Sequence, residues 1–134
     1  MPTLDTSVIV EFLRGKAAQG GAVEKAVDRG RTLFLAPHSL FELYRGAYAS
    51  GAPADEMTRI EQAIGWLVLL PFDEEAARIS AWIVQDLRAR GRPIPERDVF
   101  IAASSLAWGD GAVVTHDTEH FEKLRDHGLE VERP

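Results

Sequence analysis

This sequence of 134 residues contains no cysteine. That absence excludes thiol nucleophiles, disulfide bonds, zinc ribbons and iron–sulfur clusters for this chain acting alone. Long apolar runs are also missing. Stretches such as 66–70 fall far below the roughly 18 residues that a membrane span needs, and the N-terminus shows no basic and apolar leader. We therefore expect a cytoplasmic protein that does not enter the membrane.

Positive charge is scarce as well. The chain has 15 Lys and Arg residues against 21 Asp and Glu residues, which gives a formal net charge of −6 at pH 7. This balance argues against a protein that binds nucleic acid through a broad basic surface, because that mode needs many contacts to phosphates. Some basic residues can still form smaller positive areas on the surface: Arg14, Lys16, Arg45, Arg88, Arg90, Arg92 and Arg97.

Apolar residues, by contrast, are plentiful at 46%, which at this length suits one compact domain over residues 1–134. Short apolar segments predict strands at 3–4, 32–36, 67–70, 112–115 and 129–131. Helical spacing predicts helices from about residue 7 to Gly15, at 22–29 after a break at Gly20-Gly21, at 39–50, after Pro53, and at 74–90, 99–108 and 118–125. We expect 67–70 to be a buried strand and 99–108 a helix in the middle of the domain.

Strands and helices alternate along almost the whole chain. This order predicts an α/β protein, a three-layer α/β/α sandwich with a mainly parallel sheet of four or five strands.

Four acidic residues lie where a strand or a turn leads into a helix: Asp5, Glu42, Asp98 and Asp117. In a parallel sheet, the carboxyl ends of the strands and the starts of the next helices meet along one rim, where ligands usually bind. We therefore predict that the four carboxylates lie close together.

Each acid also has a structural explanation. Asp5 and Asp117 can cap the helices that follow them, and Glu42 forms a capping-box pattern with Ser39. Asp98 is harder to explain in this way, because it begins the most apolar helix and an unpaired buried carboxylate is costly. A metal ion or an arginine is its expected partner.

Four carboxylates in one place need a cation. Two of them about 4 Å apart repel by roughly 4 kcal/mol at an effective dielectric constant near 20. Oxygen ligands select hard divalent ions, so we expect Mg²⁺, with Mn²⁺ as its substitute, and phosphate chemistry.

The segments around the acids resemble a known family. They are Leu4-Asp5-Thr6-Ser7-Val8-Ile9, Ser39-Leu40-Phe41-Glu42-Leu43-Tyr44-Arg45-Gly46-Ala47, Asp98-Val99-Phe100-Ile101-Ala102-Ala103 and Thr115-His116-Asp117-Thr118-Glu119-His120-Phe121. In order and spacing they resemble PIN-domain proteins, in particular the VapC toxins of bacterial VapBC toxin–antitoxin pairs. The resemblance implies a metal-dependent endoribonuclease, the toxin component of a type II toxin–antitoxin system.

The same resemblance implies roles and partners. Asp5, Glu42, Asp98 and Asp117 would surround one or two Mg²⁺ or Mn²⁺ ions, with Asp5 and Asp98 as the innermost ligands. The hydroxyls of Thr6, Ser7 and Thr115 would orient the carboxylates. The implied partners are an RNA substrate, a VapB-like antitoxin and a second copy of the chain in a homodimer.

One position departs from the family pattern. Many relatives have another acid directly before the aromatic residue of the last segment, where this chain has His120. Either Asp117 alone supplies the fourth ligand or the site works with three carboxylates, and His120 is open to a contact with phosphate.

The expected reaction is hydrolysis of an RNA phosphodiester by a metal-activated water, which leaves 5′-phosphate and 3′-hydroxyl ends. The main alternative is a non-catalytic PIN-like module that binds RNA or a protein, with Tyr44, Tyr48 and Trp82 as candidates for a dimer or antitoxin surface.

A histidine metal site at His116 and His120 has less support, because the HExxH pattern is absent. His38 and His127 are expected to be solvated.

Overall fold

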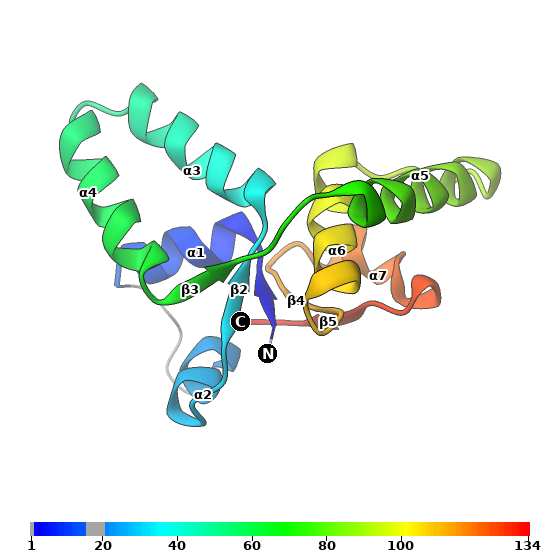
Figure 1. Ribbon diagram of the computed structural model, residues 1–134, viewed down its shortest axis with the longest axis horizontal. Coiled ribbons are helices and arrows are strands. Elements are labelled where there is room, and N and C mark those ends of the chain that lie inside the picture. Colours follow the sequence, from blue (N-terminus) through cyan, green and yellow to red (C-terminus); the bar gives the residue numbers. More distant parts are fainter. Residues whose placement is uncertain (1, 16–20) are drawn as a thin grey trace.

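The computed structural model describes residues 2–15 and 21–134 (Figure 1). Within these residues, five parallel strands form one sheet in the order β3-β2-β1-β4-β5. The strands are β1 (Thr3–Leu4), β2 (Leu33–Leu35), β3 (Leu67–Leu69), β4 (Ala112–Val114) and β5 (Glu130–Glu132). The chain winds outward from β1 in one direction through β2 and β3, and in the other through β4 and β5. The point where the direction changes lies between β1 and β4, and the prediction of a parallel sheet is confirmed.

The helices follow the strands in the predicted order. They are α1 (Thr6–Leu13), α2 (Ala22–Asp28), α3 (Pro37–Ala49), α4 (Pro53–Ile64), α5 (Glu74–Ala89), α6 (Glu96–Trp108) and α7 (Thr118–Glu122), followed by a short 3₁₀ helix, η1 (Arg125–His127). The predicted helix 118–125 is therefore divided in two. Gly20 of the predicted break lies outside the described residues.

Apolar side chains form two clusters, one with α1 to α4 and one with α5 to α7. Val113 and Val114 are neighbours in β4 yet belong to different clusters, because successive side chains of a strand point to opposite faces of the sheet. Helices thus cover both faces, and the predicted three-layer α/β/α arrangement is confirmed.

Helix α6 is the most deeply buried helix, as its sequence predicted. Val99, Ile101 and Ala102 are all 0% exposed. One of its polar side chains is bonded to the sheet: the Thr3 hydroxyl donates to Ser105 Oγ at 2.9 Å, and Ser105 Oγ donates to the carbonyl of Ala112 at 3.2 Å. Helix α6 is therefore fixed against β1 and β4, the two strands at the change of direction.

Strand β3 is not buried, contrary to the prediction for 67–70. Val68 and Leu69 are 48% and 49% exposed. The reason is position, since β3 lies at the edge of the sheet and pairs only with β2 among the described strands.

Two histidines also differ from expectation. His127 is buried, with its Nε2 2.7 Å from Asp86 Oδ2, and its ring packs edge-on against Trp82. His38 lies half-buried against Phe72 and Phe100, and this burial lowers the pKa of its imidazole. The expectation of a solvated ring is therefore wrong for His127, and His38 is only partly exposed because its ring packs against two phenylalanines.

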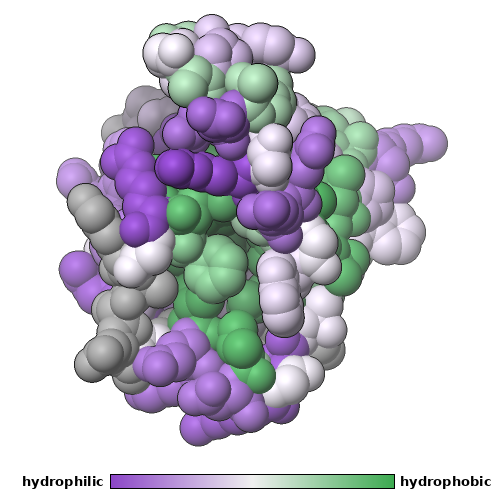
Figure 2. Space-filling model, turned by 90° about the vertical axis from the view of Figure 1, so that its left-hand side faces the viewer, coloured by the Kyte–Doolittle hydropathy of each residue, from purple (hydrophilic) through white to green (hydrophobic). Residues whose placement is uncertain are grey.

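An apolar hollow of about 380 Å³ lies between α1, α2 and the start of β3, with Phe12, Val23 and Leu67 among its lining residues. Figure 2 shows apolar side chains at the centre of this face, bordered by hydrophilic ones. The four acids do not line this hollow. No helix in the described part of the chain has the length and apolar character that crossing a membrane requires.

Candidate active site

Asp5 lies between β1 and α1. Its backbone N–H donates to the carbonyl of Val114 at 3.0 Å, which extends the pairing of β1 with β4 by one residue. The Asp5 side chain is almost fully buried. Its Oδ1 accepts from the Thr6 N–H at 2.8 Å, and its Oδ2 accepts from the Thr115 hydroxyl at 2.8 Å. Asp5 therefore caps α1 and at the same time faces the segment after β4.

Thr115 connects Asp5 with the segment that carries Asp117. The Thr115 hydroxyl accepts from the Asp117 N–H at 3.0 Å while it donates to Asp5. Asp117 occupies the N-cap position of α7, but its side chain makes no capping hydrogen bond. Its Oδ2 lies instead 3.0 Å from His120 Nδ1. Capping therefore does not account for Asp117.

Glu42 has no capping role either. Helix α3 begins at Pro37, with Ala36 as its N-cap, because the fixed φ of proline suits the first turn of a helix. Ser39 consequently lies inside the helix, where its buried hydroxyl has no hydrogen-bond partner among the described residues. The predicted capping box is wrong. The Glu42 carboxylate instead accepts from the Thr6 hydroxyl at 3.2 Å, on the side of the helix that faces α1.

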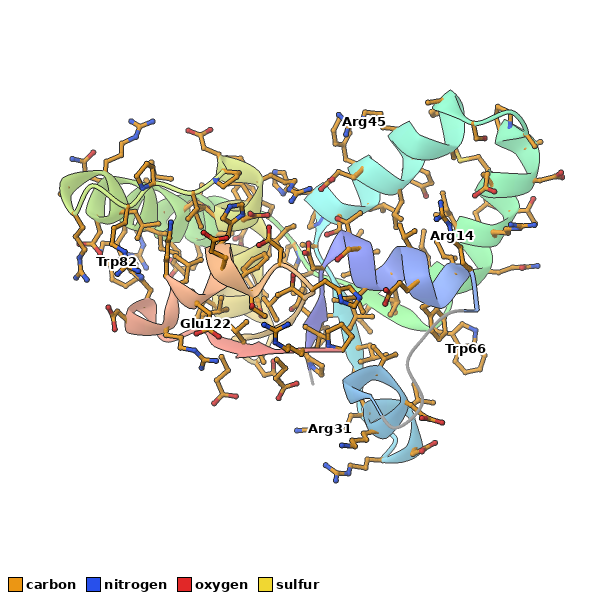
Figure 3. The ribbon with its side chains drawn as sticks, turned by 180° about the vertical axis from the view of Figure 1, so that it is seen from behind. Arg14, Arg31, Arg45, Trp66, Trp82 and Glu122 are labelled. Atoms are coloured by element: carbon orange, nitrogen blue, oxygen red, sulfur yellow. The ribbon has the colours of Figure 1, made fainter. Side chains whose placement is uncertain are left out.

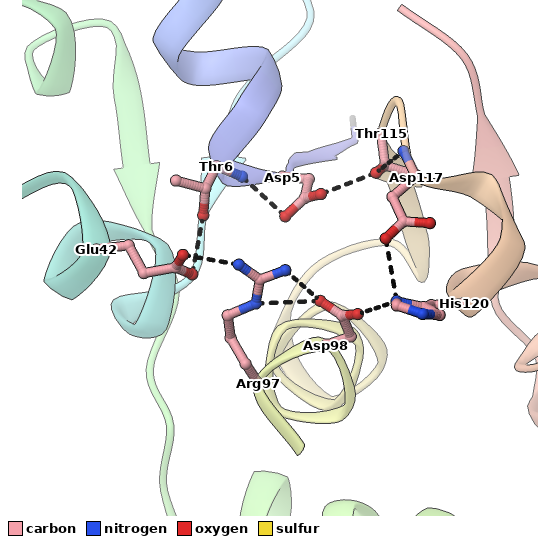
Figure 4. A network of polar contacts seen from close by, with 8 residues as sticks. All are labelled: Asp5, Thr6, Glu42, Arg97, Asp98, Thr115, Asp117 and His120. Atoms are coloured by element: carbon pink, nitrogen blue, oxygen red, sulfur yellow. Dashed lines mark hydrogen bonds and ion pairs between the residues drawn. The ribbon is translucent and has the colours of Figure 1, made fainter. Parts of the chain in front are cut away.

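Asp98 is fully buried in the first turn of α6, and both of its oxygens have partners (Figure 4). Arg97 donates to Asp98 Oδ1 through Nη2 at 2.9 Å and through Nε at 3.2 Å. The same guanidinium donates through Nη1 to Glu42 Oε2 at 2.7 Å. His120 Nδ1 lies 2.8 Å from Asp98 Oδ2. This chain's own arginine and histidine therefore meet the need of Asp98 for partners.

Burial raises the pKa of the Asp5 carboxyl above its ordinary value of 3.8. The negative charge of Asp98 raises this pKa as well, whereas hydrogen bonds from Thr115 and Thr6 and the charge of Arg97 lower it. The net upward shift means that the buried Asp5 carboxylate is less stable as an anion than a solvated one. A cation close to Asp5 would stabilise its ionised form.

The donor atoms of the site fit a divalent ion. One atom each from Asp98, Asp117 and His120 can be chosen so that all three lie within 4.8 Å of one another. Glu42 and Asp5 add carboxylates that are joined to this group through Arg97 and Thr115 (Figure 4). Carboxylate oxygens suit Mg²⁺ and Mn²⁺, and the single imidazole nitrogen is better suited to Mn²⁺ than to Mg²⁺.

A groove of about 250 Å³ lies beside the acids, between α1, α3 and α4. Thr6 and Glu42 line it, as do Arg14 and Arg59. Figure 3 shows Arg14 at the end of α1, on the side that faces α4. Arg59 lies 3.6 Å from Glu56, and Arg14 forms no ion pair within the described residues. The groove therefore places two guanidinium groups next to Glu42, although Arg59 is paired with Glu56, which also lines the groove.

The other basic residues considered above have different surroundings. Arg45 lies over the ring of Phe41, with 5.7 Å between its Cζ and the ring centroid. Arg88 lies 3.8 Å from Glu96. Lys16 is outside the described residues. Of the basic residues considered above, Arg97 contacts the acids directly and Arg14 lines the adjacent groove.

The hydroxyls named in the sequence behave differently from one another. Thr6 and Thr115 contact the carboxylates of Glu42 and Asp5, and their orienting role stays a prediction. Ser7 is exposed and makes no hydrogen bond to the four acids in the part of the chain that the structure describes.

An arginine was one of the two predicted partners of Asp98, but the sequence did not show that this arginine is Arg97 or that it also contacts Glu42. His120 was considered as a contact to phosphate or, with less support, as part of a histidine metal site, and its contacts with Asp98 and Asp117 were not predicted. A signal for Arg97 exists in its position directly before Asp98. Side chains at successive helix positions usually diverge, however, so that position alone does not predict the contact.

Comparison with known proteins is consistent with this geometry. A family model described as the PIN domain matches residues 3–126. VapC ribonuclease Y4jK of Sinorhizobium fredii is 33% identical over 143 residues, covering 100% of this chain and 97% of that protein. Ribonuclease VapC19 of Mycobacterium tuberculosis is 26% identical over 126 residues, covering 94% of this chain and 96% of that protein.

A solved structure is similar over a comparable length. A chain in the structure of DNA-bound VapBC from Salmonella typhimurium aligns with a TM-score of 0.84 and 28% identity, covering 99% of this chain and 98% of that chain. The similarity therefore extends through all of the segments that carry the four acids.

Proposed function

The chain belongs to the PIN-domain family, and we propose that it is a metal-dependent endoribonuclease, the toxin of a VapBC-type toxin–antitoxin pair. The observation that carries the proposal is the convergence of Asp5, Glu42, Asp98 and Asp117 from four separate segments into one hydrogen-bonded network. Helix capping explains only one of the four, Asp5. The network lies at the change of winding direction between β1 and β4, where open α/β sheets usually bind ligands.

The proposed ligands are the four carboxylates, with Asp5 and Asp98 innermost. Mg²⁺ is the proposed ion and Mn²⁺ its substitute. The chemistry that such an ion supplies when bound is activation of a water molecule and partial neutralisation of the charge on the phosphate.

The residues of this chain would act by holding and orienting. Thr115 fixes Asp5 and the backbone of Asp117 through one hydroxyl, and Thr6 fixes Glu42. Such outer hydrogen bonds keep carboxylates in the geometry that a metal needs. Arg14 and Arg59, in the adjacent groove, would bind phosphates of an RNA strand that extends away from the acids.

The proposed partners are an RNA substrate, a VapB-like antitoxin and a second copy of the chain. Support for the antitoxin comes from the similar solved chain, which is part of a VapBC complex. Exposed aromatic side chains, Tyr48 at 74% and Trp82 at 53%, are available for protein contacts, whereas Tyr44 packs against the core.

The proposal is tested by incubating the purified chain with single-stranded RNA and Mg²⁺, Mn²⁺ or EDTA, and then sequencing the cut ends. We expect cleavage that needs the metal and leaves 5′-phosphate and 3′-hydroxyl ends, because no attack by the 2′-hydroxyl is involved. Cleavage that persists in EDTA, or cyclic phosphate ends, would refute the proposal.

A further inference from the structure

The position of Arg97 has a consequence for metal binding. Its guanidinium binds Glu42 Oε2 at 2.7 Å and Asp98 Oδ1 at 2.9 Å, so one cation joins two of the four carboxylates. These carboxylates come from α3 and α6, which are far apart in the sequence. The other oxygen of each carboxylate also has a partner, because Glu42 Oε1 accepts from the Thr6 hydroxyl and Asp98 Oδ2 lies 2.8 Å from His120 Nδ1. A divalent ion held by both Glu42 and Asp98 would therefore compete with Arg97 for these carboxylates.

We propose that Arg97 sets the metal affinity of this site, and that a divalent ion binds Glu42 and Asp98 by displacing the guanidinium. This inference rests on the proposed function, because it concerns the same carboxylates as metal ligands. In this proposal, Arg97 opposes metal binding and is not itself a metal ligand.

The carboxylates of Glu42 and Asp98 are less free to move than the guanidinium of Arg97. Asp98 is fully buried and Glu42 is largely buried, with 14% of its side chain exposed, so both carboxylates are held by the surrounding helices. The side chain of Arg97 is 44% exposed and has a long, flexible stem. Arg97 can therefore leave the carboxylates toward solvent without a change in the backbone of α6.

Electrostatic attraction favours the divalent ion over the guanidinium of Arg97. Asp98 keeps a second partner, His120, when Arg97 leaves, and a divalent ion brings more positive charge than the guanidinium removes. The guanidinium nevertheless makes three hydrogen bonds to charged oxygens, and breaking them opposes metal binding. The net effect is a site that binds metal more weakly than its four carboxylates alone would.

The test is the affinity of the purified chain for Mn²⁺, measured by isothermal titration calorimetry without RNA. We expect Arg97→Gln to bind Mn²⁺ about 10- to 100-fold more tightly than the unsubstituted chain, because the guanidinium no longer competes with the ion for the carboxylates of Glu42 and Asp98. Arg88→Gln is the matched control. It also removes one arginine, but Arg88 lies at the end of α5 and pairs with Glu96 in solvent, where both side chains are over 60% exposed. Arg88→Gln should therefore change the affinity less than about twofold.

A second variant covers the case in which Arg97→Gln does not fold. Arg97→Lys keeps the positive charge but lacks the planar fork that reaches two carboxylates at once. We expect its Mn²⁺ affinity to lie between those of the unsubstituted chain and Arg97→Gln. Thermal melting gives an independent measurement, since addition of Mn²⁺ should raise the melting temperature more in either Arg97 variant than in Arg88→Gln.

Equal or weaker Mn²⁺ binding by the Arg97 variants, compared with Arg88→Gln, would overturn the inference and make Arg97 a residue that orients the ligands. The outcome is separate from that of the proposed function. A chain that cuts no RNA but binds Mn²⁺ more tightly after Arg97→Gln would sustain the inference alone. Metal-dependent cleavage with no effect of Arg97 on affinity would sustain the function alone.

Discussion

Asp98 shows how burial and charge combine at a single residue. A carboxylate with no exposed surface needs compensation, and Asp98 has Arg97 on one oxygen and His120 on the other. The sequence predicted that such a partner exists, because Asp98 begins the most apolar helix. The identity of the partners was not predictable, since the position of His120 depends on how α7 packs against α6.

Thr115 illustrates the same dependence for Asp5. The two residues are 110 positions apart in the sequence and are joined because β1 and β4 are neighbours in the sheet. The Thr115 hydroxyl lowers the pKa of Asp5 and thus opposes the upward shift that burial causes.

We predict that Thr115→Val raises the pKa of Asp5 further and moves the acidic limb of the pH–rate profile for RNA cleavage to higher pH. Thr115→Ser, which keeps the hydroxyl, is the control and should leave the limb in place.

The raised pKa of Asp5 also affects the stability of the fold. Because the folded pKa lies above the unfolded value, Asp5 destabilises the fold as pH rises between the two values, and it does so over a wider range in Thr115→Val. An unchanged limb in Thr115→Val would contradict the role given to this hydroxyl.

At the scale of helices and strands, most elements followed from local sequence. Helix α5 begins at Glu74, as the helix predicted at 74–90 requires, and Asp73 caps it, with Asp73 Oδ1 accepting from the Ala76 N–H at 3.2 Å. The start of α3 was missed by two residues, because helical spacing of apolar residues begins at 39 whereas the helix itself begins at Pro37, whose fixed φ suits the first turn. The exposure of β3 was missed because apolar composition does not reveal which strand lies at an edge.

Asp73 also joins two helices. Its Oδ1 accepts from Trp108 Nε1 at 2.9 Å, at the end of α6. The hydrogen bond from Trp108, followed by that from the Ala76 N–H, lowers the pKa of Asp73 below its ordinary value of 3.8.

We predict that Asp73→Ala lowers the melting temperature at pH 7 by roughly 2–6 °C, because the helix loses its cap. Asp73→Asn keeps a cap but not the charge, so its melting temperature at pH 7 should lie between those of the unsubstituted chain and Asp73→Ala. The pH dependence follows from the lowered pKa: the stabilisation by the Asp73 anion is present above the unfolded pKa and is lost as pH falls through the folded pKa. Calorimetry at pH 7 and pH 3 should therefore show the advantage over Asp73→Ala shrinking in acid. An advantage that is equal at both values would contradict this account.

At the scale of the whole molecule, alternation of strands and helices was enough to predict the α/β/α architecture and the parallel sheet. The convergence of the four acids followed from that architecture, since residues after β1, β2 and β4 share one rim. Local sequence could not show that Arg97 joins Glu42 to Asp98, because that contact depends on the distance between α3 and α6. The order of strands and helices therefore predicts which acidic residues lie close together. The packing of the helices determines which basic side chains contact them.

The central claim is that Asp98 belongs to a metal-dependent active site, and the most direct test is the rate of RNA cleavage by Asp98→Asn at saturating Mn²⁺. Asp126→Asn is the control, because it removes the same charge from an exposed side chain that contacts Arg90 outside the site. Circular dichroism should show both variants folded. We predict that Asp98→Asn lowers the rate at least about 100-fold, the upper end of the loss caused by outer partners of a metal, and that Asp126→Asn changes it little. A folded Asp98→Asn variant that cleaves RNA at the rate of Asp126→Asn would contradict the account.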